Sequence, residues 1–226
     1  LWLNGDGMSM RPSLVIFDCD GVLVDTETTA NNVLCRWLTE AGYPVTYEDC
    51  RKRFAGRSMP SVQAEIEAEG HLLGFHLMDR WYSEINQIFS QGVEAIPHIE
   101  EVLAALRDAG IPWCVASSAK IEKMHLTLGT TVLIDHFRDV LYSATMVPRG
   151  KPFPDLFLHA AREMGHAPEN CVVIEDSVWG TQAGIAAGMR VFSYHGDPHS
   201  DREGLAAAGG VLFDDMRDLP RLLSIA

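Results

Sequence analysis

The sequence is poor in basic residues, with 18 Lys and Arg against 31 Asp and Glu and a formal net charge of -13. A protein that binds the phosphate backbone of a nucleic acid needs a basic face. The shortage of positive charge therefore argues against a nucleic-acid partner. A small anionic substrate stays possible where a few basic side chains gather locally.

Long apolar runs are also missing. No segment approaches the roughly 18 to 20 apolar residues that a membrane helix requires, so we expect no membrane partner. The first residues have no basic segment followed by a long apolar one, and they do not look like a secretory signal. We expect residues 1–12 to be a flexible extension. Whether residues 1–9 are native stays open, because Met8 or Met10 could be the natural start.

Cysteine is scarce and scattered. The five cysteines are odd in number and form no Cys-x-x-Cys pair, which argues against a disulfide framework and a zinc site. We therefore expect a reducing, cytoplasmic location. The remaining composition is that of a globular protein, 47% hydrophobic and 22% charged, and 226 residues suffice for a large domain with a smaller insert.

Short apolar runs bounded by turn residues indicate strands that are buried on both faces. Helix-length segments with apolar spacing near 3.6 lie between them, such as 99–106 and 155–164. This alternation predicts an α/β fold with a doubly wound parallel sheet. The predicted strands are 14–17, 113–116, 140–142, 171–174 and 191–192.

The interval 28–91 interrupts this alternation, because it contains helical patterns and no convincing strand. We predict that it forms an all-helical inserted domain, with the sheet domain built from 13–27 and 92–226. Hinges are expected near 26–28 and 92–97. The predicted helices of the insert are 32–41, 47–54, 61–69 and 77–90.

Polar residues that can carry chemistry follow the predicted strands at their carboxyl ends. Ligands of parallel sheets bind at this edge, where the strand order reverses. One lysine joins them from a loop that precedes the helix at 155. These residues are Asp18, Asp20, Ser117, Ser118, Lys151, Glu175 and Asp176.

Four carboxylates at one edge would repel one another unless a cation balanced them, and hard oxygen ligands select Mg²⁺. Lys151 and the two serine hydroxyls would suit the oxygens of a phosphoryl group. Alternation along an extended chain directs Asp18 and Asp20 to the same side. One of them could attack phosphorus while the other protonates the leaving oxygen, and Gly21 permits the turn that follows.

Four segments together resemble a known family. FDCDGVLVDTE, VASSAK, RGKPFPD and VVIEDSVWGTQAG, in this order, look like the four motifs of the haloacid dehalogenase-like (HAD) hydrolase superfamily. The resemblance extends over about residues 14–192 and includes the helical insert, which matches the cap of capped phosphatases. It implies a Rossmann-like core, an aspartyl-phosphate formed on Asp18, and Asp20 as general acid and later base.

The same resemblance implies the roles of the other residues. Asp18, the backbone carbonyl of Asp20 and Asp176 would hold Mg²⁺, with Glu175 bound directly or through water. The phosphoryl group would be bound by Ser117, the amide of Ser118, and Lys151.

Several further residues attract attention. Arg53 and Arg57 belong to the densest basic cluster and, by hypothesis, contact an anionic group of the substrate. Asp25 is expected to cap the first helix of the cap. His195 and His199 are expected in a surface loop rather than a metal site. Three glycines spaced by four, Gly180, Gly184 and Gly188, suggest a helix packed closely against the sheet.

The function that these features favour is a Mg²⁺-dependent phosphatase acting on a small phosphorylated metabolite. A β-phosphoglucomutase-like mutase shares the core motifs, but usually has a His where this chain has Ala30. A dehalogenase proper generally lacks the second Asp, which is present here as Asp20. A non-enzymatic phospho-aspartate switch is the alternative from another class. The substrate and the oligomeric state stay open.

Overall fold

The structure is a computed structural model, and it describes residues 11–54 and 59–226. Residues 1–10 of the predicted N-terminal extension therefore lie outside the described residues, and so does Arg57. Among the residues described, no helix is long and apolar enough to cross a membrane.

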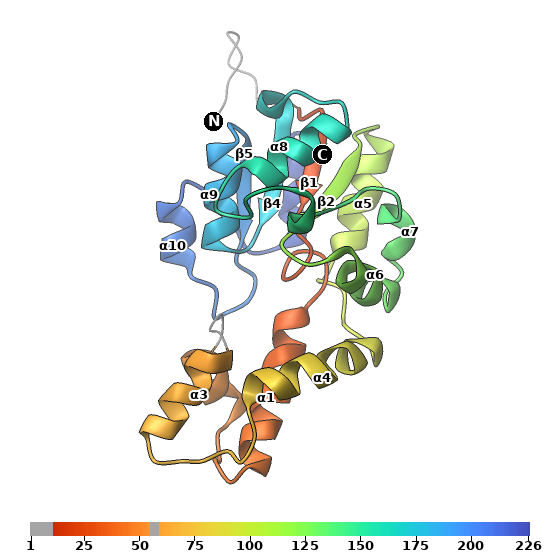
Figure 1. Cartoon of the computed structure of the whole chain (residues 1–226). Coiled ribbons are helices and arrows are strands. Elements are labelled where there is room, and N and C mark those ends of the chain that lie inside the picture. The colour runs from red at the N-terminus through yellow and green to blue at the C-terminus, as the bar shows by residue number, and fades with distance from the viewer. Residues whose placement is uncertain (1–10, 55–58) are drawn as a thin grey trace.

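The sheet has six parallel strands in the order β3-β2-β1-β4-β5-β6. The chain builds it outward from β1, first toward β2 and β3 and then toward β4, so the order reverses between β1 and β4. This confirms the predicted α/β doubly wound sheet, and Figure 1 shows helices on both of its faces. The strands are β1 (Leu14–Phe17), β2 (Trp113–Ser117), β3 (Leu141–Ser143), β4 (Cys171–Glu175), β5 (Arg190–Tyr194) and β6 (Val211–Phe213).

The sixth strand was not predicted. β6 is three residues long, lies at the edge of the sheet, and leaves Val211 45% exposed. Its three residues are apolar, but the run is shorter than the roughly four to eight residues that indicate a buried strand.

Alternation along the buried strands divides the sheet domain into two cores. In β1, Val15 and Phe17 join one apolar cluster, whereas Leu14 and Ile16 join the other. The first face is covered by α5 (Ile99–Asp108), α6 (Ile121–Gly129), α7 (Ile134–Phe137) and α11 (Leu219–Leu222). The second is covered by α8 (Asp155–Glu163) and α9 (Val178–Ala186), and α10 (Arg202–Ala207) packs beside α9 and β6.

Two of the three glycines spaced by four lie in α9 and pack as predicted. A Cβ on Gly180 would lie 1.7 Å from Glu175 Oε1, and one on Gly184 would lie 2.5 Å from Val191 Cγ2. Both glycines therefore allow α9 to approach the sheet. The prediction is wrong for Gly188, which has open space around it and a φ of +75° and lies just beyond the end of α9.

The interval predicted to form the cap contains four helices, and we keep the name cap for them: α1 (Thr26–Glu40), α2 (Tyr47–Phe54), α3 (Met59–Ala68) and α4 (Leu77–Ser90), which gather below the sheet domain in Figure 1. These helices share an apolar cluster of their own around Trp37, Leu38 and Ile66. Helix α1 begins six residues earlier than predicted, because 26–32 is polar and has no apolar period. Asp25 starts it, as expected, by accepting a hydrogen bond from the Thr28 amide at 2.9 Å.

Candidate active site

Three carboxylates meet where β1 and β4 end. Pairing of Phe17 with Ile174 brings the two strand ends level, and the Asp18 amide continues the ladder by donating to the Ile174 carbonyl at 2.9 Å. Asp18, Glu175 and Asp176 each offer an oxygen, and these atoms all lie within 4.8 Å of one another. Strand pairing thus brings together residues that are more than 150 positions apart in the chain.

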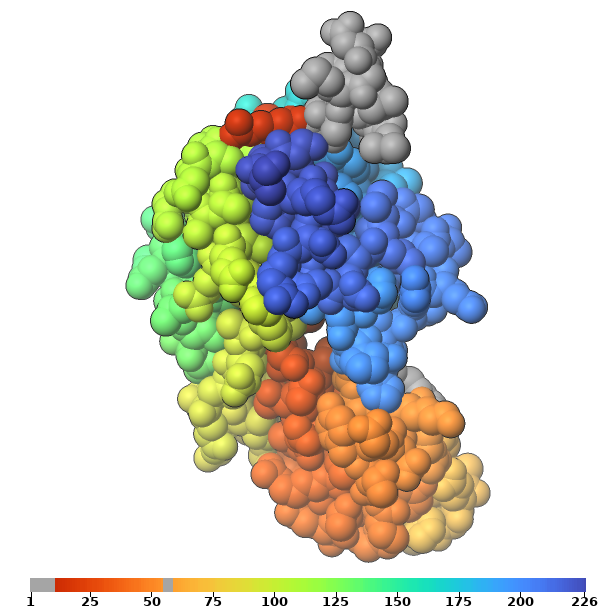
Figure 2. Space-filling model, turned by 180° about the vertical axis from the view of Figure 1, so that it is seen from behind, coloured from red at the N-terminus to blue at the C-terminus, as the bar shows by residue number. Residues whose placement is uncertain are grey.

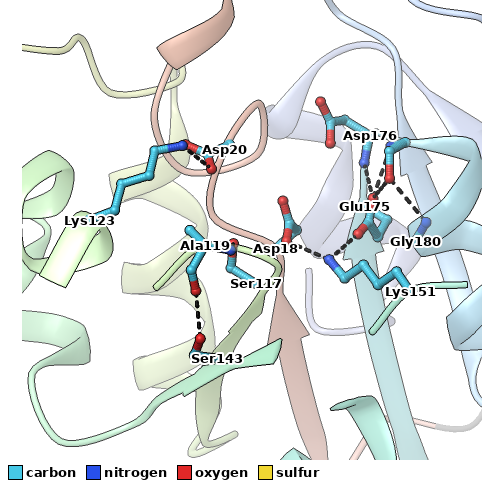
Figure 3. A network of polar contacts seen from close by, with 11 residues as sticks. Asp18, Asp20, Ser117, Ala119, Lys123, Ser143, Lys151, Glu175, Asp176 and Gly180 are labelled. Carbon is cyan, nitrogen blue, oxygen red and sulfur yellow. Dashed lines mark hydrogen bonds and ion pairs between the residues drawn. The ribbon is translucent and has the colours of Figure 1, made fainter. Parts of the chain in front are cut away.

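Lys151 reaches this cluster from the loop before α8. Its Nζ lies 2.5 Å from Asp18 Oδ1 and 2.5 Å from Glu175 Oε1, and its side chain is 5% exposed (Figure 3). Burial alone would lower the pKa of this ammonium, but the charges of Asp18 and Glu175 raise it instead. Lys151 is therefore a permanently charged group that fixes the orientation of Asp18.

One positive charge does not balance three carboxylates. Burial raises the pKa of Asp18 to about 7, although Lys151 acts in the opposite direction. Burial and the neighbouring Glu175 likewise raise the pKa of Asp176 well above its ordinary value. Among the described residues, the Asp176 carboxylate accepts no recorded hydrogen bond. A hard divalent cation such as Mg²⁺ fits this donor set, because it supplies the missing charge.

The two oxygens of Glu175 are already in use. Oε1 accepts from Lys151, while Oε2 accepts from the amides of Asp176 and Ser177 and from the Ser177 hydroxyl, at 2.9 to 3.0 Å. Asp18 and Asp176 therefore have the freer oxygens for a metal, and Glu175 is better suited to contact it through water.

Gly21 makes room for Asp176. Its φ is +79°, and an added Cβ would lie 1.9 Å from Asp176 Oδ2. The turn after β1 therefore needs glycine for its backbone conformation and also for the approach of a candidate metal ligand. The sequence predicted the first of these reasons and not the second.

The Asp20 carboxylate lies outside the acidic cluster, so three rather than four side-chain carboxylates converge. Its Oδ1 accepts from the Thr26 hydroxyl at 2.7 Å, and its Oδ2 accepts from Lys123 Nζ at 2.7 Å. Metal binding by the Asp20 backbone carbonyl stays a prediction. Lys123 was missed by the sequence reasoning, although it belongs to the first turn of the helix that follows the second motif.

Ser117 and Ser118 lie at the end of β2, next to β1. Ser117 is buried and its hydroxyl accepts from the Ala119 amide at 3.1 Å, whereas Ser118 is exposed. Ser143, at the end of β3, donates to the Ala119 carbonyl at 2.7 Å and holds this loop in place (Figure 3). The loop beside Asp18 is thus fixed, and its phosphate-binding role stays a prediction.

The arginines of α2 point to different partners. Arg51, 4% exposed, forms ion pairs with Glu27 at 3.4 Å and with Asp197 in the loop after β5. Arg53 forms ion pairs with Glu65 at 2.7 Å and Glu69 at 2.5 Å, within the cap. Substrate contact by Arg53 stays a prediction, and Arg57 lies outside the described residues.

A pocket of about 340 Å³ lies between the cap and the sheet domain, where Figure 2 shows the surface hollowed. It borders Asp176 and includes His199 of the loop after β5, as expected for a surface loop. Neither His195 nor His199 joins a metal-type cluster in the described ranges. The pocket is rich in carboxylates: Asp25, Glu27, Glu48, Asp176 and Asp197.

Known proteins resemble the chain over most of its length. A 6-phosphogluconate phosphatase of Escherichia coli (strain K12) is 35% identical over 192 residues, which cover 84% of this chain and 86% of that protein. Hexitol phosphatase A of the same organism is 28% identical over 85% of this chain and 88% of that protein. A crystal structure of a HAD family hydrolase from Deinococcus radiodurans R1, with bound phosphate and sodium, has a TM-score of 0.84 at 32% identity and covers 96% of this chain and 97% of that chain.

The family model of haloacid dehalogenase-like hydrolases matches residues 12–188, a span that includes all four motifs and the cap. Together with the strand order and the acidic cluster beside β1 and β4, this match settles the family. The chain is a member of the haloacid dehalogenase-like hydrolases.

Proposed function

We propose that this phosphomonoester hydrolase removes phosphate from small phosphorylated sugars, with Mg²⁺ as cofactor and an aspartyl-phosphate on Asp18 as intermediate. The observation that carries the proposal is the convergence of Asp18, Glu175 and Asp176 on one point beside Lys151. Asp18 and Asp176 would hold the ion, which when bound would supply positive charge against the phosphoryl oxygens.

The chain's own residues provide the covalent steps. Lys151 donates to Oδ1 of Asp18, which leaves Oδ2 as the oxygen that would attack. That oxygen bonds to phosphorus while the ester P–O bond breaks, and the departing alkoxide takes a proton from Asp20. In the second half, Asp20 takes a proton from water as the hydroxide bonds to phosphorus and the Asp18 carboxylate is released.

Two relatives support the substrate class, because one is a 6-phosphogluconate phosphatase and the other is hexitol phosphatase A. The junction between the cap and the sheet domain is large enough for one molecule of this class, since its pocket near Asp176 measures about 340 Å³.

All five cysteines are unpaired, which supports the proposed cytoplasmic location.

The decisive experiment is a phosphate-release screen of the purified protein over hexitol, aldonate and aldose phosphates. We expect release with Mg²⁺, loss of release with excess chelator, and none from an Asp18→Asn variant that is still folded. Release by the Asp18→Asn variant at the wild-type rate would reject the aspartyl-phosphate. Absence of release from every ester, with a stable phospho-aspartate on the protein, would favour the switch.

The mutase alternative has a separate test. Ala30 lies on α1, at the position where the mutases resembling this chain usually have a His. Incubation with β-glucose 1-phosphate and a bisphosphate primer should therefore yield free phosphate. Accumulation of glucose 6-phosphate would favour the mutase.

A further inference from the structure

The Asp20 carboxylate is fixed through both of its oxygens. Thr26, the first residue of α1, donates to Oδ1 at 2.7 Å, and Lys123 of the sheet domain donates to Oδ2 at 2.7 Å. Each carboxyl oxygen has a second position for a proton or a hydrogen bond, so these contacts leave the group able to exchange a proton. They do fix the plane of the carboxyl group.

Lys123 is itself held by the cap. It lies on the first turn of α6, which packs against α4, and its Nζ is 5.3 Å from the centre of the Phe89 ring. Phe89 belongs to the last turn of α4 and is 2% exposed. Attraction between an ammonium and the face of an aromatic ring favours this arrangement. The Lys123 side chain thus connects a cap helix to Asp20.

Lys123 also borders open space. A groove of about 320 Å³ runs between α4 and α6, lined among others by Trp81, Tyr82, Lys120 and Lys123. The pocket of similar size beside Asp176 is lined by five carboxylates. Arg51 pairs with two of these carboxylates, Glu27 and Asp197, and Asp176 is a candidate metal ligand, so the acidic pocket stays available to an anionic ester.

We propose that Lys123 is a positioning residue for Asp20, and that α4 holds it in place through Phe89. The inference rests on the proposed function. By donating a hydrogen bond to Oδ2, Lys123 directs the carboxyl group toward the leaving oxygen. That oxygen keeps the electron pair of the broken P–O bond and is protonated by Asp20. A carboxyl group that rotates away loses much of this benefit.

The test compares leaving groups. An alkoxide leaves poorly without a proton, whereas p-nitrophenolate leaves readily without one, and kcat/KM reports only the steps up to departure of the alcohol. Lys123→Met should lower kcat/KM about 30- to 100-fold for a sugar phosphate that the wild-type protein hydrolyses, and less than about threefold for p-nitrophenyl phosphate. Equal losses for both esters would overturn the proposal.

Three further variants separate position from charge and folding. Lys123→Arg should recover part of the loss, since a guanidinium can also donate to Asp20. Phe89→Leu should show a weaker loss, about 3- to 10-fold, with the same dependence on the leaving group. Lys120→Met removes a positive charge from the same groove without touching Asp20. If it reproduces the Lys123→Met pattern, Lys123 acts through its charge on the substrate and the proposal is wrong.

The outcome is distinguishable from failure of the proposed function. If the wild-type protein hydrolyses neither ester, the proposed function is lost. If it hydrolyses both and Lys123→Met behaves like wild type, only the role of Lys123 is lost. Thermal unfolding of each variant, measured beside the kinetics, identifies losses that come from misfolding.

Discussion

One group of charged side chains in the sheet domain converges on a single point, whereas Arg53 of the cap pairs with carboxylates of the cap. In the sheet domain, Asp18 follows β1, Glu175 ends β4 and Lys151 comes from the loop before α8, and together with Asp176 they leave carboxylate charge unbalanced. In the cap, Arg53 meets Glu65 and Glu69, so its charge is neutralised locally. Charged side chains that converge with a surplus of negative charge indicate a binding site for a ligand. Opposite charges that pair locally indicate stabilisation of the surface.

The difference follows from architecture. Parallel strands end at the same edge, so their loops present side chains to a common centre. Cap helices bury an apolar stripe around Trp37, and Arg53, Glu65 and Glu69 lie partly exposed to solvent, where they form ion pairs. In the described parts of the chain, the two regions meet through ion pairs such as Arg51 with Asp197, and through Phe89 of α4, which joins an apolar core of the sheet domain and lies beside Lys123.

Removing Lys151 should have the largest effect. Lys151→Met removes the ammonium that holds Asp18 and would meet the phosphoryl group, so kcat/KM should fall about 100- to 1,000-fold. Steady-state phosphate release with the best substrate measures it. Lys52→Met provides the cap control, because Lys52 is exposed on α2. A Lys151→Met activity within threefold of that control would contradict a catalytic role.

Two glycines allow a sharper comparison of the regions. Gly21 in the sheet domain and Gly42 in the cap have φ values of +79° and +83°, but only Gly21 has a neighbour in the place of an added Cβ. Both alanine variants should lose about 1 to 2 kcal/mol of unfolding free energy from the backbone alone. Only Gly21→Ala should also weaken Mg²⁺ binding, by about 10- to 100-fold, since it displaces Asp176.

Titration calorimetry and chemical denaturation of the two alanine variants measure these effects. Equal Mg²⁺ affinity in both variants would show that Asp176 does not bind the ion.

The acidic cluster should also make Mg²⁺ stabilisation depend on pH. In the metal-free protein the pKa of Asp18 is raised by burial to about 7, and that of Asp176 is raised as well. A raised pKa stabilises the fold at low pH, and this stabilisation is lost as pH rises from about 4 through 7. Mg²⁺ binds the deprotonated carboxylates, so at one fixed concentration it should raise Tm more at pH 8 than at pH 5.5.

The matched control for this titration is Asp176→Asn, which should flatten the pH dependence. An equal rise in Tm at both pH values in the wild-type protein would remove the cluster as the binding site.

The sequence was sufficient to predict which carboxylates lie together at the strand ends. Asp18, Glu175 and Asp176 lie at the end of an apolar strand or directly after it, so their meeting depends on strand order. The partners of Asp20 were not predictable in the same way. Whether Lys123 reaches Asp20 depends on how α6 packs against α4, and no local pattern records that packing. The early start of α1 was missed for a different reason. Its first turns are polar, and they depend on Asp25 as the N-terminal capping residue.

The smallest effects concern the two arginines of α2. Arg51 is 4% exposed and joins the cap to Asp197, so Arg51→Met should lower the unfolding free energy by about 1.5 to 3 kcal/mol. Its Nε is buried without a hydrogen-bond partner, which favours the lower end of this range. Arg53 is 33% exposed, and each of its ion pairs should contribute less than about 1 kcal/mol.

Denaturant unfolding of Arg51→Met, Asp197→Asn and the double variant isolates the contact between cap and sheet domain, because a true pair gives less than additive losses. Arg53→Met is the comparison on the same helix, and its KM for an acidic phosphoester tests the predicted substrate contact in the same preparation. A larger stability loss for Arg53→Met than for Arg51→Met would reverse the comparison. The cap would then depend on its internal ion pairs more than on its attachment to the sheet domain.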